Sequence, residues 1–269
     1  MPAPEADLAL IEQAVRDAGV IARKFYQGSY RKWDKGTGQP VTECDLAIDK
    51  FLCERLCRAR PDYGWLSEET EDDPQRLHAK FVWVVDPIDG TVAFLKGRPH
   101  FTICAAVVGS GRPLAGVVYN PITGECFGAI SGMGATLNAK QIHVSNRREL
   151  ENCRMLGPAT TFDHPPASIA PTVPWPPMHV ETRNSVAYRL ALVACGAFDA
   201  TVALSAKHDW DLAAGDLIVQ EAGGRITTHA GETLRYNGET PVQPSVVAAG
   251  PALHAQLVAR VRTVKLPAR

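Results

Sequence analysis

The sequence lacks any apolar run that approaches the roughly 20 residues a membrane-spanning helix needs. Its beginning, MPAPEADLALIEQAVRDAGV, is acidic early and has neither the basic flank nor the apolar core of a secretory signal. We therefore expect neither a membrane protein nor an exported one, and the cytoplasm is the expected location.

An excess of charge of either sign is also missing. Lysine and arginine together number 28, aspartate and glutamate 29, and the formal net charge is −1. Proteins that bind nucleic-acid polymers or anionic membrane surfaces usually carry a strongly basic patch or balance. The composition therefore predicts neither kind of partner.

Cysteine pairing of a recognisable kind is the third absence. The seven cysteines are an odd number and are scattered singly along the chain. Cys53 and Cys57 lie one helical turn apart, but no histidine or cysteine pair nearby completes a zinc pattern. We expect reduced, mostly buried thiols rather than a disulfide framework or a zinc site.

Two kinds of apolar pattern are present and alternate along the chain. Apolar residues at helical spacing predict helices over 5–26, about 45–60, 185–196 and 209–224. Short β-branched and aromatic runs, such as FVWVV at 81–85, predict buried strands between them. This alternation predicts an α/β protein of stacked layers.

One segment interrupts the pattern. Residues 158–179 are dense in proline, so they are expected to be extended rather than helical. We interpret them as the connection between an N-terminal half, about 1–157, and a C-terminal half, about 180–269. The whole chain, 1–269, is then one domain.

The motif WVVDPIDGT carries the first chemical signal. A buried strand ends at Asp86, and the turn that Pro87 and Gly90 force brings Asp89 back toward it. Two carboxylates held so close repel each other, and a hard divalent cation between them relieves the repulsion. Alone the motif is an ordinary turn, so it gains weight only from its companions.

Two further acidic motifs accompany it. SEE at 67–69 follows another short strand, and DWD at 209–211 begins a helix. Separately they read as a solvated acidic loop and a helix N-cap. Together with Asp86 and Asp89 they predict a cluster of oxygen ligands suited to metal-assisted phosphoryl displacement.

These motifs, WLSEE, WVVDPIDGT and WDLAAGDLIVQEAGG in this order, resemble those of the inositol monophosphatase superfamily. The likeness runs from about residue 8 to the last helix. It implies a Mg2+-dependent, lithium-sensitive phosphatase acting on a small phosphorylated metabolite. It also implies a layered αβαβα sandwich of the inositol monophosphatase and sugar phosphatase type, commonly a homodimer.

The resemblance implies a set of metal ligands. Glu68, Asp86 and the carbonyl of Ile88 would hold one Mg2+ ion. Asp86, Asp89 and Asp211 would hold a second. A third, weaker ion would contact Glu68.

The resemblance also implies catalytic and phosphate-binding roles. Thr91, oriented by Asp45, would act with Glu68 to position and activate the attacking water. The backbone amides of Gly90 and Thr91 would bind the phosphate oxygens, as amides at the start of a helix do.

The substrate-binding residues are less defined. Inositol monophosphatases usually carry a glutamate several residues before WD, which binds a substrate hydroxyl, but Ala203, Leu204 and Ser205 occupy that stretch here. The helix NSVAYRLALVA is similar to that of CysQ-type 3'(2'),5'-bisphosphate nucleotidases. Ser185 and Arg189 would then contact the substrate, with the Arg189 guanidinium on its second phosphate. A solvated helix residue is the plainer interpretation of Arg189.

The sequence therefore favours a 3'(2'),5'-bisphosphate nucleotidase that converts adenosine 3',5'-bisphosphate to AMP. An inositol-1-monophosphatase is the close alternative, because the isoleucine of DPIDGT is more frequent in that branch. A SuhB-like regulatory binding protein is a further alternative. The intact set of acids argues against a pure binding role, since a scaffold gains nothing from clustered carboxylates.

Overall fold

The computed structural model describes residues 4–266 except 27, 29, 35 and 37–39. Its helices are α1 (Pro4–Phe25), α2 (Glu43–Ala59), η1 (Pro74–His78), α3 (Thr91–Leu95), α4 (Ala159–Phe162), α5 (Val186–Ala194), α6 (Asp209–Glu221) and α7 (Pro251–Val261). No helix in these described ranges is both long enough and apolar enough to cross a membrane.

The strands form two large sheets and two small ribbons. The seven-stranded sheet has the order β3 (Gly64–Ser67), β4 (Phe81–Asp89), β5 (Thr102–Gly109), β6 (Arg112–Tyr119), β7 (Cys126–Ile130), β8 (Gly134–Leu137), β9 (Lys140–Gln141). The five-stranded sheet has the order β11 (His179–Glu181), β10 (Arg154–Leu156), β12 (Ala200–Ala203), β16 (Val246–Ala249), β14 (Arg225–Thr227). The ribbons pair β1 (Lys32–Asp34) with β2 (Pro40–Thr42) and β13 (Lys207–His208) with β15 (Val242–Gln243).

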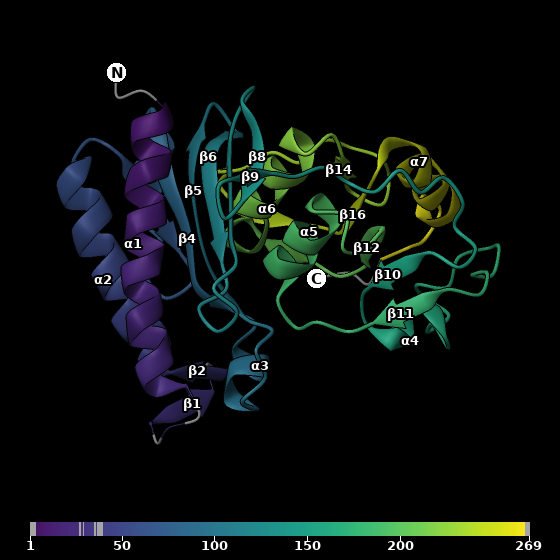
Figure 1. The fold of residues 1–269 in the computed structure, drawn as a ribbon, viewed down its shortest axis with the longest axis horizontal. Coiled ribbons are helices and arrows are strands. Elements are labelled where there is room, and N and C mark those ends of the chain that lie inside the picture. The colour runs from purple at the N-terminus through teal and green to yellow at the C-terminus, as the bar shows by residue number, and fades with distance from the viewer. Residues whose placement is uncertain (1–3, 27, 29, 35, 37–39, 267–269) are drawn as a thin grey trace.

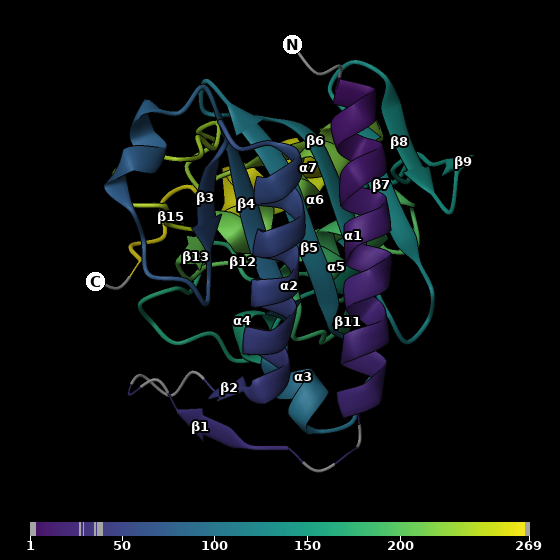
Figure 2. The same ribbon diagram turned by 90° about the vertical axis from the view of Figure 1, so that its left-hand side faces the viewer.

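These elements stack in five layers. Figure 1 shows α1 and α2, then the seven-stranded sheet, then α5 and α6, then the five-stranded sheet, and finally α7. Figure 2, turned by 90°, shows α1 and α2 lying side by side across the outer face of the first sheet. The predicted αβαβα sandwich is confirmed.

The outer helices form where the apolar spacing predicted them. Buried residues of α1 recur at helical spacing and face the sheet, among them Ile11, Val15 and Ala18. Helix α2 begins with a capping box between Thr42 and Asp45, which satisfies backbone donors of the first turn. This box fixes Asp45 at the end of the helix nearest the acidic motifs.

Strand β4 carries the acidic turn. It runs parallel to β3 and antiparallel to β5, and its pairing with β5 shifts register between Asp86 and Asp89. Such an irregularity bends a strand and redirects its side chains. Asp86 pairs with Cys104 and Asp89 with Thr102, so three steps along β4 match two along β5. The extra residue allows Asp86 and Asp89 to present their carboxylates on the same face of the sheet.

The proline-rich segment lies elsewhere than the sequence suggested. Residues 158–179, which include α4, connect β10 to β11, two parallel neighbours of the same sheet. Parallel strands need a long crossover connection, and this proline-rich chain supplies it. It is irregular except for the short helix α4, so the expectation that the segment is not helical is wrong at Ala159–Phe162. The two sheets are joined earlier, between Gln141 and Arg154, so the interpretation of 158–179 as the border between the halves is wrong.

The central helices approach each other very closely. A Cβ atom added to Gly215 of α6 would lie 2.7 Å from Cδ1 and 2.9 Å from Cβ of Leu190 on α5. Glycine is therefore required at this crossing. Because α6 begins with the third acidic motif and α5 follows Ser185, this contact sets how the two helices meet at the acidic turn.

We predict that Gly215→Ala lowers the free energy of unfolding by about 1–3 kcal/mol, because the added methyl group forces α5 and α6 apart. Urea denaturation followed by circular dichroism measures the change. Gly238→Ala is the matched control, since its added Cβ meets only the Thr240 carbonyl oxygen at 3.7 Å. Equal stability of the two variants would contradict this account of the crossing.

Candidate active site

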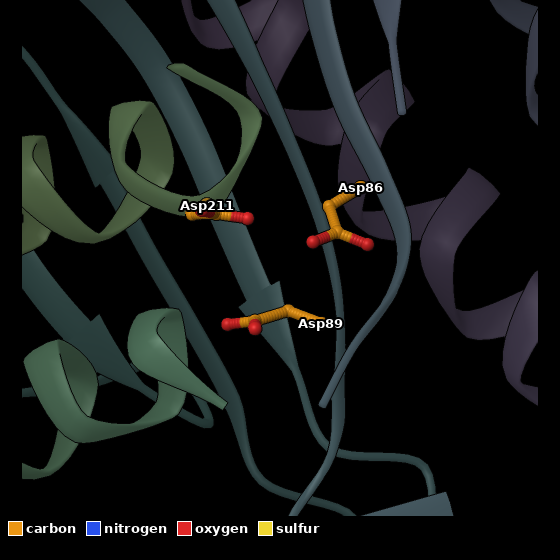
Figure 3. Close-up of side chains that lie close together, drawn as sticks. All are labelled: Asp86, Asp89 and Asp211. Carbon is orange, nitrogen blue, oxygen red and sulfur yellow. The ribbon is translucent and has the colours of Figure 1, made fainter. Parts of the chain in front are cut away.

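Three carboxylates from two elements converge at the end of β4. Asp86 and Asp89 come from β4 and Asp211 from the first turn of α6, and one oxygen of each lies within 4.8 Å of the others. Figure 3 shows the three side chains directed toward a common space. Glu68, which follows β3, lines the same cavity.

The cavity has a volume of about 230 Å³. Its lining contains every predicted metal ligand together with Gly90 and Thr91: Pro40, Glu68, Asp86, Ile88, Asp89, Gly90, Thr91, Val92, Asn184 and Asp211. Residues separated by more than 140 positions therefore meet at one point. The structure thus brings the residues of the three acidic motifs together, and their roles as ligands stay a prediction.

Local hydrogen bonds explain the shape of the acidic turn. The Ile88 amide donates to Asp86 Oδ1 at 2.9 Å, which closes a tight turn over Pro87. Gly90 follows with φ of 99°, and a Cβ there would lie 3.1 Å from both the His100 carbonyl oxygen and the Ser185 amide nitrogen. Only glycine fits this position without strain.

Residues at the start of α5 bind the carboxylate of Asp89. Its Oδ2 accepts hydrogen bonds from the Ser185 hydroxyl at 2.7 Å and from the Ala187 amide at 2.6 Å. The same Ser185 hydroxyl accepts the Tyr188 amide as the N-cap of α5. One serine thus caps the helix and fixes the orientation of Asp89.

Asp211 is fixed by its own helix. The His208 amide donates to Asp211 Oδ2 at 2.9 Å in the capping arrangement that opens α6. The His208 ring stacks on Trp210, with ring centroids 4.5 Å apart. His208 therefore has a structural role beside the site.

Thr91 lies between two acceptors. Its hydroxyl oxygen is 3.4 Å from Asp45 Oδ1 and 3.2 Å from the Ile88 carbonyl oxygen. Asp45 is buried and accepts both the amide and the hydroxyl of Thr42 on its other oxygen. The predicted pairing of Asp45 with Thr91 is therefore present in the geometry. Burial raises the pKa of Asp45 to about 6, against the opposing hydrogen bonds from Thr42.

The electrostatics of the cluster suit a cation. Burial, followed by repulsion from Glu68, Asp89 and Asp211, raises the pKa of Asp86 well above its usual range. Burial and the charge of Asp89 raise the pKa of Asp211 to about 8. Buried carboxylates that repel one another, all with hard oxygen donors, fit a divalent cation such as Mg2+ or Mn2+.

Two predicted substrate contacts lie away from the cavity lining. Ser185 is fully buried and acts on Asp89, as described above. Arg189 lies one turn further along α5, and its side chain is only 4% exposed, so it is not a solvated helix residue. Contact of either residue with a substrate stays a prediction.

Two residues near the acids were not predicted from the sequence to belong to the site. Asn184 lines the cavity immediately before Ser185. The Lys207 ammonium is attracted electrostatically to Asp211 and Asp89. The only sequence indication for Lys207 was its position four residues before Asp211. Sequence spacing alone does not show whether its side chain is directed toward the acids.

A model of the inositol monophosphatase family matches residues 5–266, nearly the whole chain. The chain belongs to the inositol monophosphatase family. This membership agrees with the acidic cluster and with the phosphoric monoester hydrolase class that the motifs predicted.

Curated relatives in this family carry two kinds of name. An inositol-1-monophosphatase of Caulobacter vibrioides is 34% identical over 94% of this chain and 99% of that protein. A Nus factor SuhB of Xylella fastidiosa is 37% identical over 77% of this chain and 76% of that protein.

Solved structures agree with the fold. The SuhB protein of Bartonella henselae superposes with a TM-score of 0.81 at 28% identity, covering 96% of this chain and 99% of that one. An inositol monophosphatase of Thermotoga maritima superposes with a TM-score of 0.80 at 27% identity, covering 96% and 97%.

We predict that Asp86→Asn lowers phosphate-monoester hydrolysis by at least about 10²-fold, because it removes the carboxylate shared by both predicted cation positions. The melting temperature in EDTA should not fall, because the substitution also removes a buried acid that its neighbours repel. Phosphate release and differential scanning fluorimetry measure the two effects. Lower stability in EDTA would show that Asp86 serves the fold rather than the site.

Proposed function

We propose that this protein is a Mg2+-dependent phosphatase of small phosphate monoesters, with an inositol phosphate as its leading substrate. The observation that carries the proposal is the convergence of Glu68, Asp86, Asp89 and Asp211 on one cavity that Gly90 and Thr91 also line. Carboxylates for cations and backbone amides for phosphate oxygens are the two requirements of metal-assisted phosphate hydrolysis.

The family resemblance implies two cation positions within this cavity. Glu68, Asp86 and the Ile88 carbonyl oxygen would hold one ion, and Asp86, Asp89 and Asp211 the other. When bound, such ions neutralise phosphate charge and lower the pKa of coordinated water. We propose that the cavity binds two such ions, or three when a weaker ion also contacts Glu68.

The other residues orient the reactants. The Thr91 hydroxyl, placed between Asp45 and the Ile88 carbonyl, can hold a water near Glu68. Glu68 can accept a proton from that water as a general base. Gly90 and Thr91 present backbone amides to the phosphate, so no covalent intermediate on a side chain is required.

The comparisons favour inositol phosphate over the bisphosphate nucleotide that the sequence analysis preferred. The Caulobacter relative, which this chain matches over almost its full length, is named an inositol-1-monophosphatase. Plant relatives are also named inositol monophosphatases, including one from Solanum lycopersicum at 33% identity.

One observation keeps the 3'(2'),5'-bisphosphate nucleotidase as a second candidate. Leu204, which takes the place of the hydroxyl-binding glutamate, is buried and apolar. Two cations, Arg189 and Lys207, instead interact with the acids of the site. An extra positive field favours a substrate with two phosphate groups over one with a single phosphate group.

A regulatory role is the third candidate, because several relatives are named Nus factor SuhB. Such a role requires a partner-binding surface rather than turnover. The catalytically impaired Asp86→Asn variant separates the two: it would keep a binding effect and lose an enzymatic one.

A homodimer and a cytoplasmic location belong to the same proposal, and light scattering of the purified protein tests the dimer.

The substrate test is phosphate release with Mg2+ from inositol 1-phosphate and from adenosine 3',5'-bisphosphate, each with and without Li+. We expect the higher kcat/KM for inositol 1-phosphate and inhibition by Li+. A clear preference for the bisphosphate would overturn the leading substrate and support the second candidate. Release from neither compound would leave only other phosphate monoesters or a binding role.

We predict that Thr91→Val lowers kcat by about 10²-fold, the usual loss when a group that positions a proton transfer is removed. Thr91→Ser should keep most of the activity, because it retains the hydroxyl between Asp45 and Ile88. Steady-state kinetics with the better substrate decide the matter. Equal activities of the valine and serine variants would exclude a role for this hydroxyl.

A further inference from the structure

Helix α5 contains one residue that does not fit its surroundings. All nine of its residues are buried, and eight of them are apolar or aromatic. The exception is Arg189, whose Nε and Nη1 atoms are buried without a hydrogen-bond partner. A buried guanidinium is costly unless an opposite charge compensates it.

The compensating charges lie on the face of α5 where Asp89 binds. Ser185 and the Ala187 amide hold Asp89, and Arg189 lies four residues after Ser185, so it occupies the same face one turn along. Helix α6, whose first turn contains Asp211, packs against α5 at the next residue, Leu190. Arg189 is accordingly attracted to both Asp89 and Asp211.

Arg189 acts on these acids through space. Among the described residues, it forms no ion pair with either acid, and its Nε and Nη1 donate to neither. Little water lies between charges in such a buried region, so the effective dielectric constant is low and the field reaches further than at the surface. The positive charge of Arg189 therefore stabilises the negative charges of Asp89 and Asp211 without a direct contact.

Lys207 adds a second cation on the same side. Its Nζ donates to the Ser205 hydroxyl and to the Ala206 carbonyl oxygen, each at 2.9 Å, which fixes the ammonium group in place. It is attracted to Asp211 and Asp89 and repelled by Arg189. Both cations are thus attracted to the same two carboxylates. Glu68, which follows β3, and Asp86, which lies on β4 with Asp89, add negative charge to the same cluster.

We propose that Arg189, together with Lys207, is the internal counter-charge of the Asp89–Asp211 pair and weakens the binding of divalent cations there. The inference rests on the proposed metal dependence. In the metal-free protein the two cations offset the repulsion among the acids. Once a divalent ion binds, the same positive charges repel it, so removing one of them strengthens cation binding.

The direction of the change in cation affinity distinguishes this proposal from a structural disturbance caused by the substitution. A substitution that merely disturbed α5 would displace Asp89 and weaken cation binding. Removal of a repelling charge makes it tighter. A residue that contacts only the substrate would leave the affinity of the free enzyme for cations unchanged.

The experiment is calorimetric titration of the metal-free protein with Mn2+ at constant pH and ionic strength, without substrate. We expect Arg189→Met to bind Mn2+ about tenfold more tightly at the Asp89–Asp211 site, as removal of a charge in a poorly solvated region allows. Arg189→Lys keeps the charge and should stay near the wild-type value. The exposed Arg148 supplies the control Arg148→Met, which should change nothing.

Lys207→Met should shift the affinity in the same direction by less, because Lys207 is more exposed, and it carries the test if Arg189→Met does not fold. Unchanged or weaker binding in whichever of these two variants is measured overturns the inference. Unchanged Mn2+ affinity with a raised KM for adenosine 3',5'-bisphosphate would assign Arg189 to the substrate instead. If the wild-type protein bound no Mn2+, the proposed metal-dependent function would itself be wrong.

Discussion

The mutual repulsion of four acids in one cavity is the constraint on which the rest of this structure depends. Asp86 and Asp89 are buried, Glu68 and Asp211 are partly buried, and each would be more stable in water. The fold brings them together nevertheless, from β4, from the segment after β3 and from α6. A bound cation would convert this unfavourable cluster into a favourable one.

The layered architecture holds the acids in place by separate means. The irregular pairing of β4 with β5 between Asp86 and Asp89 allows both carboxylates to lie on the same face of the sheet. The start of α5 fixes Asp89 through Ser185, and the capping arrangement of α6 fixes Asp211. The glycine at the α5–α6 crossing then allows both helices to reach the strand end. Preorganisation of this kind keeps ligands in position before a cation arrives.

The sequence predicted those features that local patterns encode. The helices of the outer layer, the buried strand at 81–85 and the meeting of the three acidic motifs followed from spacing, turn residues and family resemblance. The predicted end of that strand at Asp86 was wrong, because β4 continues through an irregularity to Asp89. The contacts of Ser185 and Arg189 did not, because nothing within α5 shows which side of the helix faces Asp89. The place of 158–179 was also missed, since a proline-rich connection reads the same between two sheets as within one. Tertiary packing decides such questions.

The most direct test of the central claim is a crystal structure of the protein with Mn2+, with diffraction recorded at the manganese absorption edge. This account predicts an anomalous peak bound by oxygens of Asp86, Asp89 and Asp211, and a second peak near Glu68 and the Ile88 carbonyl. A crystal grown with Mn2+ that shows no anomalous peak at these carboxylates, or that binds manganese only at surface sites, would contradict the assignment of this cluster as a metal centre.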